Sequence, residues 1–395
     1  MKTGFLDWNM QPCIFKHYPS SLFSYPLSTT PQLRFLHLAR CVTSEHSVGG
    51  KPYKRLSIPS AGNLHPLEIY VQVRGVKGIL SGIYHLDSDA DKLVLVRDIE
   101  ADGLEINVGM QKRFKGMIIM VSSVPFRSIW KYQERAIRYC YLDLGHQLAG
   151  LSVSALSQNK SLTFLSEFDR YGLNKLMGLD EQEQILSVIL CGEESDKTAK
   201  PLSSSLIRVQ PTDYYESYRI QEEVFKRYGD FELPMSGEVL QAIPALDEVI
   251  LSRRSSREFL LKSIKKESLE QIMQLLLQLP QNISCDMVLI RSEGYKPGIY
   301  QGSYLKREGV YVSEIVDLLL HQQFIFNASL VLVFSSADFS AKLLTQTAYF
   351  IHILSLLIPD MNLGLSGIGA FYDKEMQVFL QTDRSILYTV AVGSV

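Results

Sequence analysis

The spacing of apolar and polar residues is most regular between Trp130 and His146, where it predicts one helix. One stripe of that helix follows steps of four, four, three and four and carries Lys131, Arg135, Tyr139, Leu142 and His146. A second, apolar stripe can face the core and carries Trp130, Ile137, Leu144 and Leu148. The polar stripe is either a solvated face or the lining of a pocket. Its combination of aromatic bulk with fixed charge favours the pocket.

Other apolar runs and turn-forming clusters outline an α+β domain around this helix. Residues 1–30 are rich in proline, serine and aromatic side chains and are expected to form an arm. A turn-forming cluster, Pro59 to Pro66, directly precedes a predicted strand. The pattern predicts a helix at 32–42 and strands at 67–73, 82–85, 93–96, 115–124 and 185–192.

The second half of the chain repeats the first. The stretch Ile386–Gly393 matches Ile185–Gly192 in residue type, and Gly298-Ile299-Tyr300 corresponds to Gly82-Ile83-Tyr84. A predicted strand at 330–334 corresponds to the one before the Lys131 helix. We therefore expect an arm (1–30), a first half (31–195), a linker (196–240) and a second half (241–395). A repeat of this length indicates duplicated domains, which would bury a face against each other like a dimer on one chain.

The linker is marked by a shift in composition to serine, lysine, glutamate and tyrosine. Within it, the pattern from Tyr214 to Tyr228 predicts an exposed, charged helix.

Composition limits the number of domains, the partners and the cellular location that we expect. Its 395 residues suit two domains, and 40 basic against 42 acidic residues give a formal charge of −2, so neither nucleic acid nor a membrane surface is an expected partner. Five scattered cysteines without a Cys-x-x-Cys pair argue against a disulfide framework or a zinc site. The N-terminus does not resemble a signal peptide, and the apolar runs at 330–334 and 350–358 are too short to span a membrane. We expect a soluble, cytoplasmic protein with no metal site.

Three short motifs carry candidate chemistry, and each has a structural alternative. Arg253-Arg254-Ser255-Ser256-Arg257-Glu258-Phe259 is either a solvated charge run or a phosphate site, since guanidinium and hydroxyl donors together suit a phosphate. The cluster Pro59 to Pro66 is either a tight turn or a loop that lets backbone approach a flat polar ring. A glycine loop predicted at 364–371 is equally consistent with a packing turn.

Together with the Lys131 helix, these motifs resemble a known family. Arg-Arg-Ser-x-Arg-x-Phe, the Pro-Ser-Ala-Gly loop before a strand, and Lys-Tyr-x-x-Arg-Ala-x-Arg-Tyr with Asp-x-Gly-His are similar to nitroreductase-like flavoproteins. More narrowly, they resemble the SagB/ThcOx-type dehydrogenases, which oxidise azoline rings of modified peptides. Leu6-Asp7-Trp8 with Gln11-Pro12 looks similar to tandem members. The resemblance implies two nitroreductase-like domains, each a central antiparallel sheet flanked by helices, forming an intrachain pseudo-dimer.

The resemblance also implies one FMN site per chain, built from both halves. The first half would supply Pro59, Ser60, Ala61, Gly62, Asn63 and Arg135, and the second half Arg253, Arg254, Ser255, Arg257, Gly367, Ile368 and Gly369. The mirror site lacks an arginine motif, has Phe164-Leu165-Ser166-Glu167 in place of Gly367-Ile368-Gly369-Ala370, and has no Pro-Ser loop at 275–279. Its counterpart of the Lys131 helix, Gln346 to His352, carries no cations.

The implied activity is an FMN-dependent oxidation of azolines to azoles. Lys131 or Tyr132 would be the catalytic base that accepts the proton lost by the substrate. Two alternatives remain: a flavin-dependent reductase or dehydrogenase of nitro, enone or other conjugated small molecules, and a flavin-free scaffold that holds a peptide or partner. Expected partners are a peptide or small-molecule substrate and other peptide-modifying enzymes, with the chain as a monomeric pseudo-dimer or a higher homo-oligomer.

Overall fold

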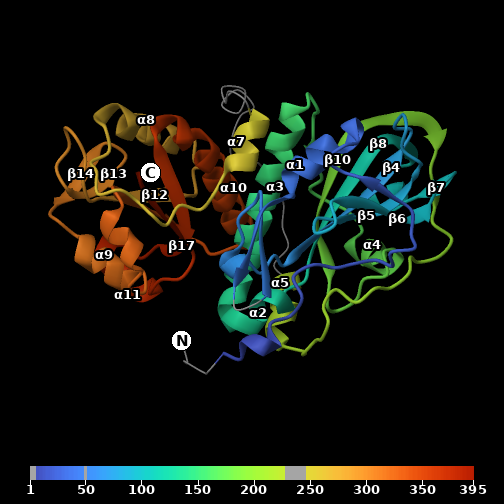
Figure 1. Cartoon of the computed structure of the whole chain (residues 1–395), viewed down its shortest axis with the longest axis horizontal. Helices are drawn as coiled ribbons and strands as arrows, with labels where there is room; N and C mark the ends of the chain where they lie inside the picture. Colours follow the sequence, from blue (N-terminus) through green and yellow to red (C-terminus); the bar gives the residue numbers. More distant parts are fainter. Residues whose placement is uncertain (1–5, 49–50, 227–245) are drawn as a thin grey trace. The chain divides into compact units, whose positions relative to one another are not determined.

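The computed structural model describes residues 6–48, 51–226 and 246–395. It divides the chain into two compact units, Met1–Phe231 and Glu232–Val395. Each unit is an antiparallel sheet with helices packed against it (Figure 1). The predicted fold class, two α+β domains each built on a central antiparallel sheet, is confirmed.

Unit 1 contains a seven-stranded sheet in the order β1-β6-β5-β4-β8-β10-β9. Its strands are β1 (Ser24–Pro26), β4 (Leu67–Arg74), β5 (Gly82–Asp87), β6 (Lys92–Asp98), β8 (Lys112–Ser123), β9 (Thr163–Phe164) and β10 (Gln184–Thr198). Two small ladders pair β2 (Val42–Val48) with β3 (Lys51–Leu56), and β7 (Asp102–Gly103) with β11 (Lys200–Pro201).

The helices of unit 1 differ in burial, from eighteen of 22 residues in the longest helix to one of seven in the helix that follows Asp169. They are α1 (Arg34–Ala39), α2 (Phe126–Tyr132), α3 (Ala136–Ser157), α4 (Arg170–Leu176) and α5 (Arg219–Lys226), with 3₁₀ turns η1 (Trp8–Met10), η2 (Pro31–Leu33), η3 (Ala61–Asn63), η4 (Glu105–Val108) and η5 (Gln133–Arg135). One apolar core lies around Tyr70, Ile118 and Val188. Every residue of β4 is buried, rather than alternate ones, so both faces of this strand are covered.

Unit 2 has a six-stranded sheet in the order β14-β13-β12-β15-β17-β16 and a core of its own around Val288, Val331 and Ala391. Its strands are β12 (Ser284–Leu289), β13 (Gly298–Gln301), β14 (Tyr304–Glu308), β15 (Leu330–Ser336), β16 (Leu363–Ile368) and β17 (Ser385–Ser394). Its helical segments are α7 (Leu246–Ser252), α8 (Lys266–Leu276), α9 (Val312–Leu318), η6 (Gln323–Asn327), α10 (Ala341–Leu357), η7 (Ile358–Met361) and α11 (Asp373–Leu380).

The internal repeat extends to the register of the sheets. In unit 1, Ile189 pairs with Ile119 on one side and Phe164 on the other; in unit 2, Val390 pairs with Leu332 and Gly367. Following the pairs across each sheet leads to Tyr84 in unit 1 and Tyr300 in unit 2. Both tyrosine hydroxyls donate to the carbonyl four residues earlier, at 2.7 and 2.8 Å. The two sheets thus share a register at these positions, and Phe164 stands where unit 2 has Gly367.

The single helix predicted from Trp130 to His146 is wrong. Helix α2 ends at Tyr132, Gln133 adopts φ +48° and ψ −127°, and α3 begins at Ala136 after the short turn η5. Unit 1 has the whole segment 124–135 between β8 and α3, whereas unit 2 has only residues 337–340 between β15 and α10. The segment that carries Lys131 and Tyr132 therefore has no counterpart in unit 2.

Three other predicted elements differ from the structure. The glycine loop predicted at 364–371 is largely the edge strand β16, in which small residues let the chain pass close to its neighbours. Within the predicted 214–228 helix, of which residues 227 and 228 lie outside the described residues, only α5 is helical, and Val224 and Phe225 are buried. The helix predicted at 32–42 is shorter, since α1 ends at Ala39 and Val42 begins β2.

The segment between the two halves is attached to unit 1 as far as it is described. Strand β11 pairs with β7, the Arg97 guanidinium donates to the Ser204 carbonyl at 2.7 Å, and Arg127 donates to the Pro211 carbonyl at 2.7 Å. The rest of the expected linker, residues 227–240, lies outside the described residues.

One stretch, Ala341–Met361, is long and apolar enough by composition to cross a membrane, and 89% of its most apolar window is buried. Such burial is also typical of the core helix of a soluble protein.

Candidate active site

The loop from Pro59 to Pro66 has a backbone that its residue types permit. Gly62 and Asn63 have φ of +64° and +60°, in the left-handed region that glycine and asparagine tolerate best. The Asn63 side chain donates to the Lys54 carbonyl at 2.8 Å and contacts His65 Nε2 at 3.0 Å. These contacts hold the loop in one shape.

Asp143 on α3 anchors the start of this loop. Its carboxylate accepts from the Ser60 hydroxyl at 2.5 Å and from the Ala61 N–H at 3.2 Å, and the Ser60 hydroxyl in turn accepts from the His65 N–H at 2.9 Å. Burial raises the pKa of Asp143 to about 7, although Ser60, Ala61 and Arg40 all favour the carboxylate. The Ser60 side chain thus positions the loop and is already engaged within unit 1.

Lys131 and Tyr132 lie against the tip of the loop. A Cβ built on Gly62 would overlap the Tyr132 hydroxyl and would lie 3.2 Å from Lys131 Nζ. Only a glycine leaves room at this point for both side chains. The pair sits at the end of α2, directly before the left-handed Gln133, a conformation that is costly for a residue with a side chain.

Arg135 belongs to the same neighbourhood through Tyr139. The Tyr132 and Tyr139 rings meet edge to face with centroids 4.5 Å apart. Burial raises the pKa of Tyr139, and a hydrogen bond from Arg135 opposes that rise. Unit 1 therefore gathers the loop, Lys131, Tyr132 and Arg135 in one place.

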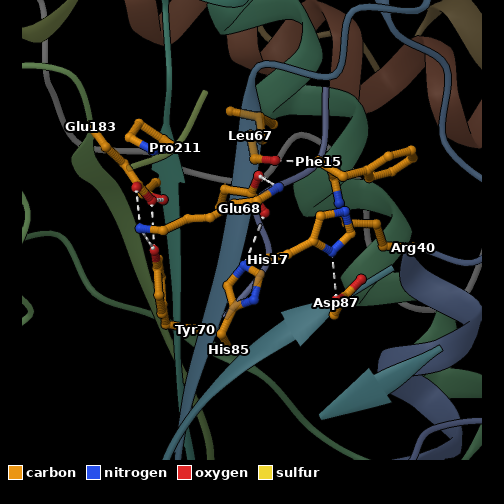
Figure 2. Close-up of polar contacts among 12 residues, drawn as sticks. Phe15, His17, Arg40, Leu67, Glu68, Tyr70, His85, Asp87, Glu183 and Pro211 are labelled. Atoms are coloured by element: carbon orange, nitrogen blue, oxygen red, sulfur yellow. Dashed lines mark hydrogen bonds and ion pairs between the residues drawn. The ribbon is translucent and has the colours of Figure 1, made fainter. Parts of the chain in front are cut away.

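A buried network of charges supports the loop from the sheet side (Figure 2). Glu68 on β4 pairs with His85 at 3.1 Å. It also pairs with Arg127 at 2.7 Å, and Arg127 donates to the His65 carbonyl at 2.9 Å. Arg40 donates to the Leu67 carbonyl at 2.7 Å. Burial alone would raise the pKa of Glu68, but Arg127, His85 and Arg40 together outweigh it, and the pKa lies below its usual range. These paired charges fix the loop and strand β4 together.

Unit 2 gathers the second group of predicted residues. The Ser256 N–H donates to the Leu365 carbonyl of β16 at 2.9 Å, and a Cβ on Gly364 would overlap the Ser256 hydroxyl. The arginine motif therefore lies along the glycine-containing strand. Arg253 is buried, and burial together with Arg254 lowers its pKa to about 10, so it remains charged at neutral pH. Ser255 and Arg257 are exposed.

The predicted residues thus form two clusters, one in each unit. Cluster 1 contains Pro59–Asn63, Lys131, Tyr132 and Arg135; cluster 2 contains Arg253–Arg257 with Gly367 and Ile368 on β16 and Gly369 just after it. Three further residues at these clusters, Asp143, Ser256 and Trp8, had no predicted role. The Asp-x-Gly-His pattern was the available signal for Asp143, whereas nothing in the spacing connects Trp8 with Lys131.

Comparison with known proteins identifies the family. The profile of the Nitroreductase family matches residues 35–193 and 250–394, which is most of the chain and both units. The chain belongs to the nitroreductase family.

Individual relatives are more distant. A candidate nitroreductase from Methanocaldococcus jannaschii is 26% identical over 167 residues, covering 41% of this chain and 80% of the relative. The crystal structure of a candidate nitroreductase from Anabaena variabilis aligns with 98% of this chain and 95% of its own, at 22% identity and a TM-score of 0.78. That likeness shows the fold.

A chain of the Escherichia coli microcin synthetase McbBCD complex aligns with 46% of this chain and 71% of its own, at 15% identity and a TM-score of 0.34. A TM-score this low carries no argument for a shared activity.

Proposed function

We propose that this protein is an FMN-dependent oxidoreductase with one flavin site per chain, in which clusters 1 and 2 meet as the two units associate as a pseudo-dimer. Membership of the nitroreductase family supports an oxidoreductase, and the resemblance of the motifs supports FMN. The asymmetry of the two units supports a single site. Unit 2 has no segment equivalent to α2–η5, and Phe164 fills the place in unit 1 that corresponds to Gly367.

The donors of cluster 2 fit the phosphate of FMN. Arg253, Arg254 and Arg257 offer charged, forked N–H donors, and Ser255 offers a hydroxyl beside them. The fixed bond from Ser256 to β16 keeps this short segment in place. In cluster 1, the left-handed backbone at Gly62 brings the main chain itself next to Lys131 and Tyr132, which suits a flat ring held against backbone.

We further propose that the reaction is the oxidation of an azoline ring of a modified peptide to an azole. The ring loses two electrons and two protons, one proton leaving with both electrons as hydride and the other as H⁺. Bound FMN supplies the acceptor for the hydride. Lys131 or Tyr132 receives the H⁺, and Gly62 and the Tyr139 ring hold the Tyr132 side chain for that role.

The observation that carries this proposal is the position of Lys131 and Tyr132 at the tip of the loop. An oxidation that releases a proton needs a proton acceptor at the site, and this pair supplies one. Reduction of a nitro or enone substrate is the second candidate, favoured by the family to which the chain belongs. The two candidates differ in the direction of electron flow.

The experiment compares Lys131→Ala and Tyr132→Phe with wild type in anaerobic stopped-flow, following the bleaching of FMN by an azoline peptide. Both variants should retain FMN, and removal of the base should slow bleaching by about 10²–10⁴-fold. Lys175→Ala, which changes an exposed lysine on α4, is the matched control. Wild-type rates in both variants would refute the catalytic assignment. Flavin that no azoline bleaches, but that a nitro compound reoxidises, would favour the reductase.

We also propose a cytoplasmic setting in which the substrate is a peptide or small molecule and other peptide-modifying enzymes are partners. The near-neutral charge and the unpaired pattern of cysteines support such a setting.

A further inference from the structure

The N-terminal arm is attached to unit 1 at several points. Lys16 is buried, and its Nζ donates to Tyr70 Oη at 2.7 Å and pairs with Glu183 at 2.8 Å. The Tyr70 hydroxyl on β4 donates to Glu183, which directly precedes β10, at 2.9 Å, beside the Glu68 network (Figure 2). Nearer the N-terminus, the Cys13 N–H donates to Asp213 at 2.8 Å, and the Tyr214 hydroxyl donates to the Met10 carbonyl. The arm therefore has a fixed path up to Met10.

This path brings the Trp8 ring over the candidate base. Lys131 Nζ lies 4.8 Å from the centroid of the Trp8 ring and 5.2 Å from that of the Tyr132 ring. Trp8 also meets Trp130 edge to face, with centroids 5.7 Å apart. Even so, 55% of Trp8 remains exposed, so few contacts hold the indole in place.

The chain itself thus supplies a flat conjugated ring, the Trp8 indole, that covers the Lys131 amine. The π face of the indole attracts the amine when that amine is protonated. The substrate and the indole cannot both lie directly over Lys131. Rotation of the Trp8 side chain away from Lys131 would leave the Lys16 and Cys13 attachments intact.

We propose that the place over Lys131 now taken by the Trp8 indole is the subsite for the planar ring of the substrate, and that Trp8 is an intramolecular occupant which the substrate displaces. The identity of that ring as an azoline or azole rests on the proposed function. The subsite itself rests on the distances between Trp8, Trp130 and Lys131.

An occupant that competes with a ligand lowers its apparent affinity by the fraction of time that it fills the site. Trp8→Ala should therefore lower the KM for the azoline peptide by about five-fold or more and leave kcat unchanged. Trp8→Phe, with a smaller ring, should fall between Trp8→Ala and wild type. Phe23→Ala is the matched control, because Phe23 is an aromatic of the same arm that is 52% exposed and contacts Tyr25 instead.

A second readout needs no flavin chemistry. Trinitrobenzenesulfonate labels exposed amines, and mass spectrometry locates the label, with Lys175 as the internal reference. Lys131 should react about five-fold faster or more in Trp8→Ala than in wild type. A dipeptide carrying one thiazole ring should protect Lys131, and at a lower concentration in Trp8→Ala.

The labelling and protection of Lys131 decide whether Trp8 competes with the substrate ring. Equal labelling of Lys131 in wild type and Trp8→Ala would overturn the proposal, and so would protection that needs more thiazole dipeptide in the variant, since Trp8 would then bind the ring rather than compete with it. If protection behaves as expected but no azoline reduces the flavin, the subsite stands and the azoline oxidation is refuted.

Discussion

Replacing Gly62 by alanine tests the contact between the loop and the candidate base. The new Cβ would sit at φ +64° and overlap the Tyr132 hydroxyl. Left-handed backbone costs a residue with a Cβ about 1–2 kcal/mol. The overlap itself should destabilise the fold only slightly, because the far end of a tyrosine side chain can move. Its main cost is the edge-to-face contact with Tyr139, about 0.5–1.5 kcal/mol.

The effect on activity should be much larger than the effect on stability. A catalytic group displaced by about 1 Å can lose about 10²-fold in rate. We therefore expect Gly62→Ala to bind FMN, to unfold at a slightly lower denaturant concentration, and to bleach about 10²-fold more slowly with substrate. Denaturant unfolding and anaerobic stopped-flow on the same preparation measure both quantities.

Gly109→Ala separates the clash from the backbone strain. Gly109 also lies in unit 1 and has φ +83°, but a Cβ there would meet nothing within 4 Å. This control should lose a similar free energy of unfolding and keep the wild-type bleaching rate. If both variants bleach at the same rate, the loop does not position Tyr132, and the reasoning behind cluster 1 is wrong.

Three further predictions concern the phosphate, the buried aspartate and the arm. Arg253→Ala and Arg257→Ala should fold but purify without flavin, since each removes charge-assisted bonds to the phosphate. The control Lys374→Ala on α11 should stay yellow. If the arginine variants also stay yellow, the motif is a solvated face and not a phosphate site. Burial raises the folded-state pKa of Asp143 to about 7 from its ordinary value of 3.8, so the contribution of its protonated form to stability is complete below pH 3.8 and is lost as the pH rises through 7. The unfolding free energy of wild type should therefore fall relative to Asp143→Asn from pH 5 to pH 8, and parallel pH profiles would contradict this. Lys16→Met leaves Glu183 buried without its cation and should cost about 3–5 kcal/mol in urea unfolding, whereas Lys296→Ala, in an exposed pair of similar distance, should leave the midpoint unchanged; equal midpoints would show that Lys16 anchors nothing.

The central strands of both sheets were predictable because they are runs of mostly buried residues, as in β4, β8 and β15. Strands β5, β8 and β10 begin or end within a few residues of their predicted limits, and the Gly-Ile-Tyr repeat correctly aligned β5 with β13. Buried strands and matching repeats of this kind depend on local composition, which the sequence displays directly.

The break after Tyr132 was not predictable from spacing. The helical stripe from Lys131 to His146 continues through Gln133, and no glycine or proline marks the left-handed turn there. Similarly, glycines at 364, 367 and 369 indicated a loop, although two of them lie in an edge strand beside Ser256 and Tyr388. In both cases tertiary packing determines the backbone.

The candidate site was predictable in part. The motifs led to Lys131, Tyr132 and the Pro59–Asn63 loop, which the structure brings together within unit 1. Trp8 was missed because its contact with Lys131 joins residues far apart in the sequence, and such contacts leave no local pattern.

The most direct test of the central claim is the amount of flavin bound to the purified chain. Heat releases the cofactor, its absorbance and chromatographic mobility identify FMN, and the amount is compared with protein concentration. One complete site assembled from clusters 1 and 2 predicts about one FMN per chain, and loss of that FMN in Arg253→Ala. Two flavins per chain would mean that the second site is intact. No flavin, together with no binding when FMN is added, would contradict the proposed function.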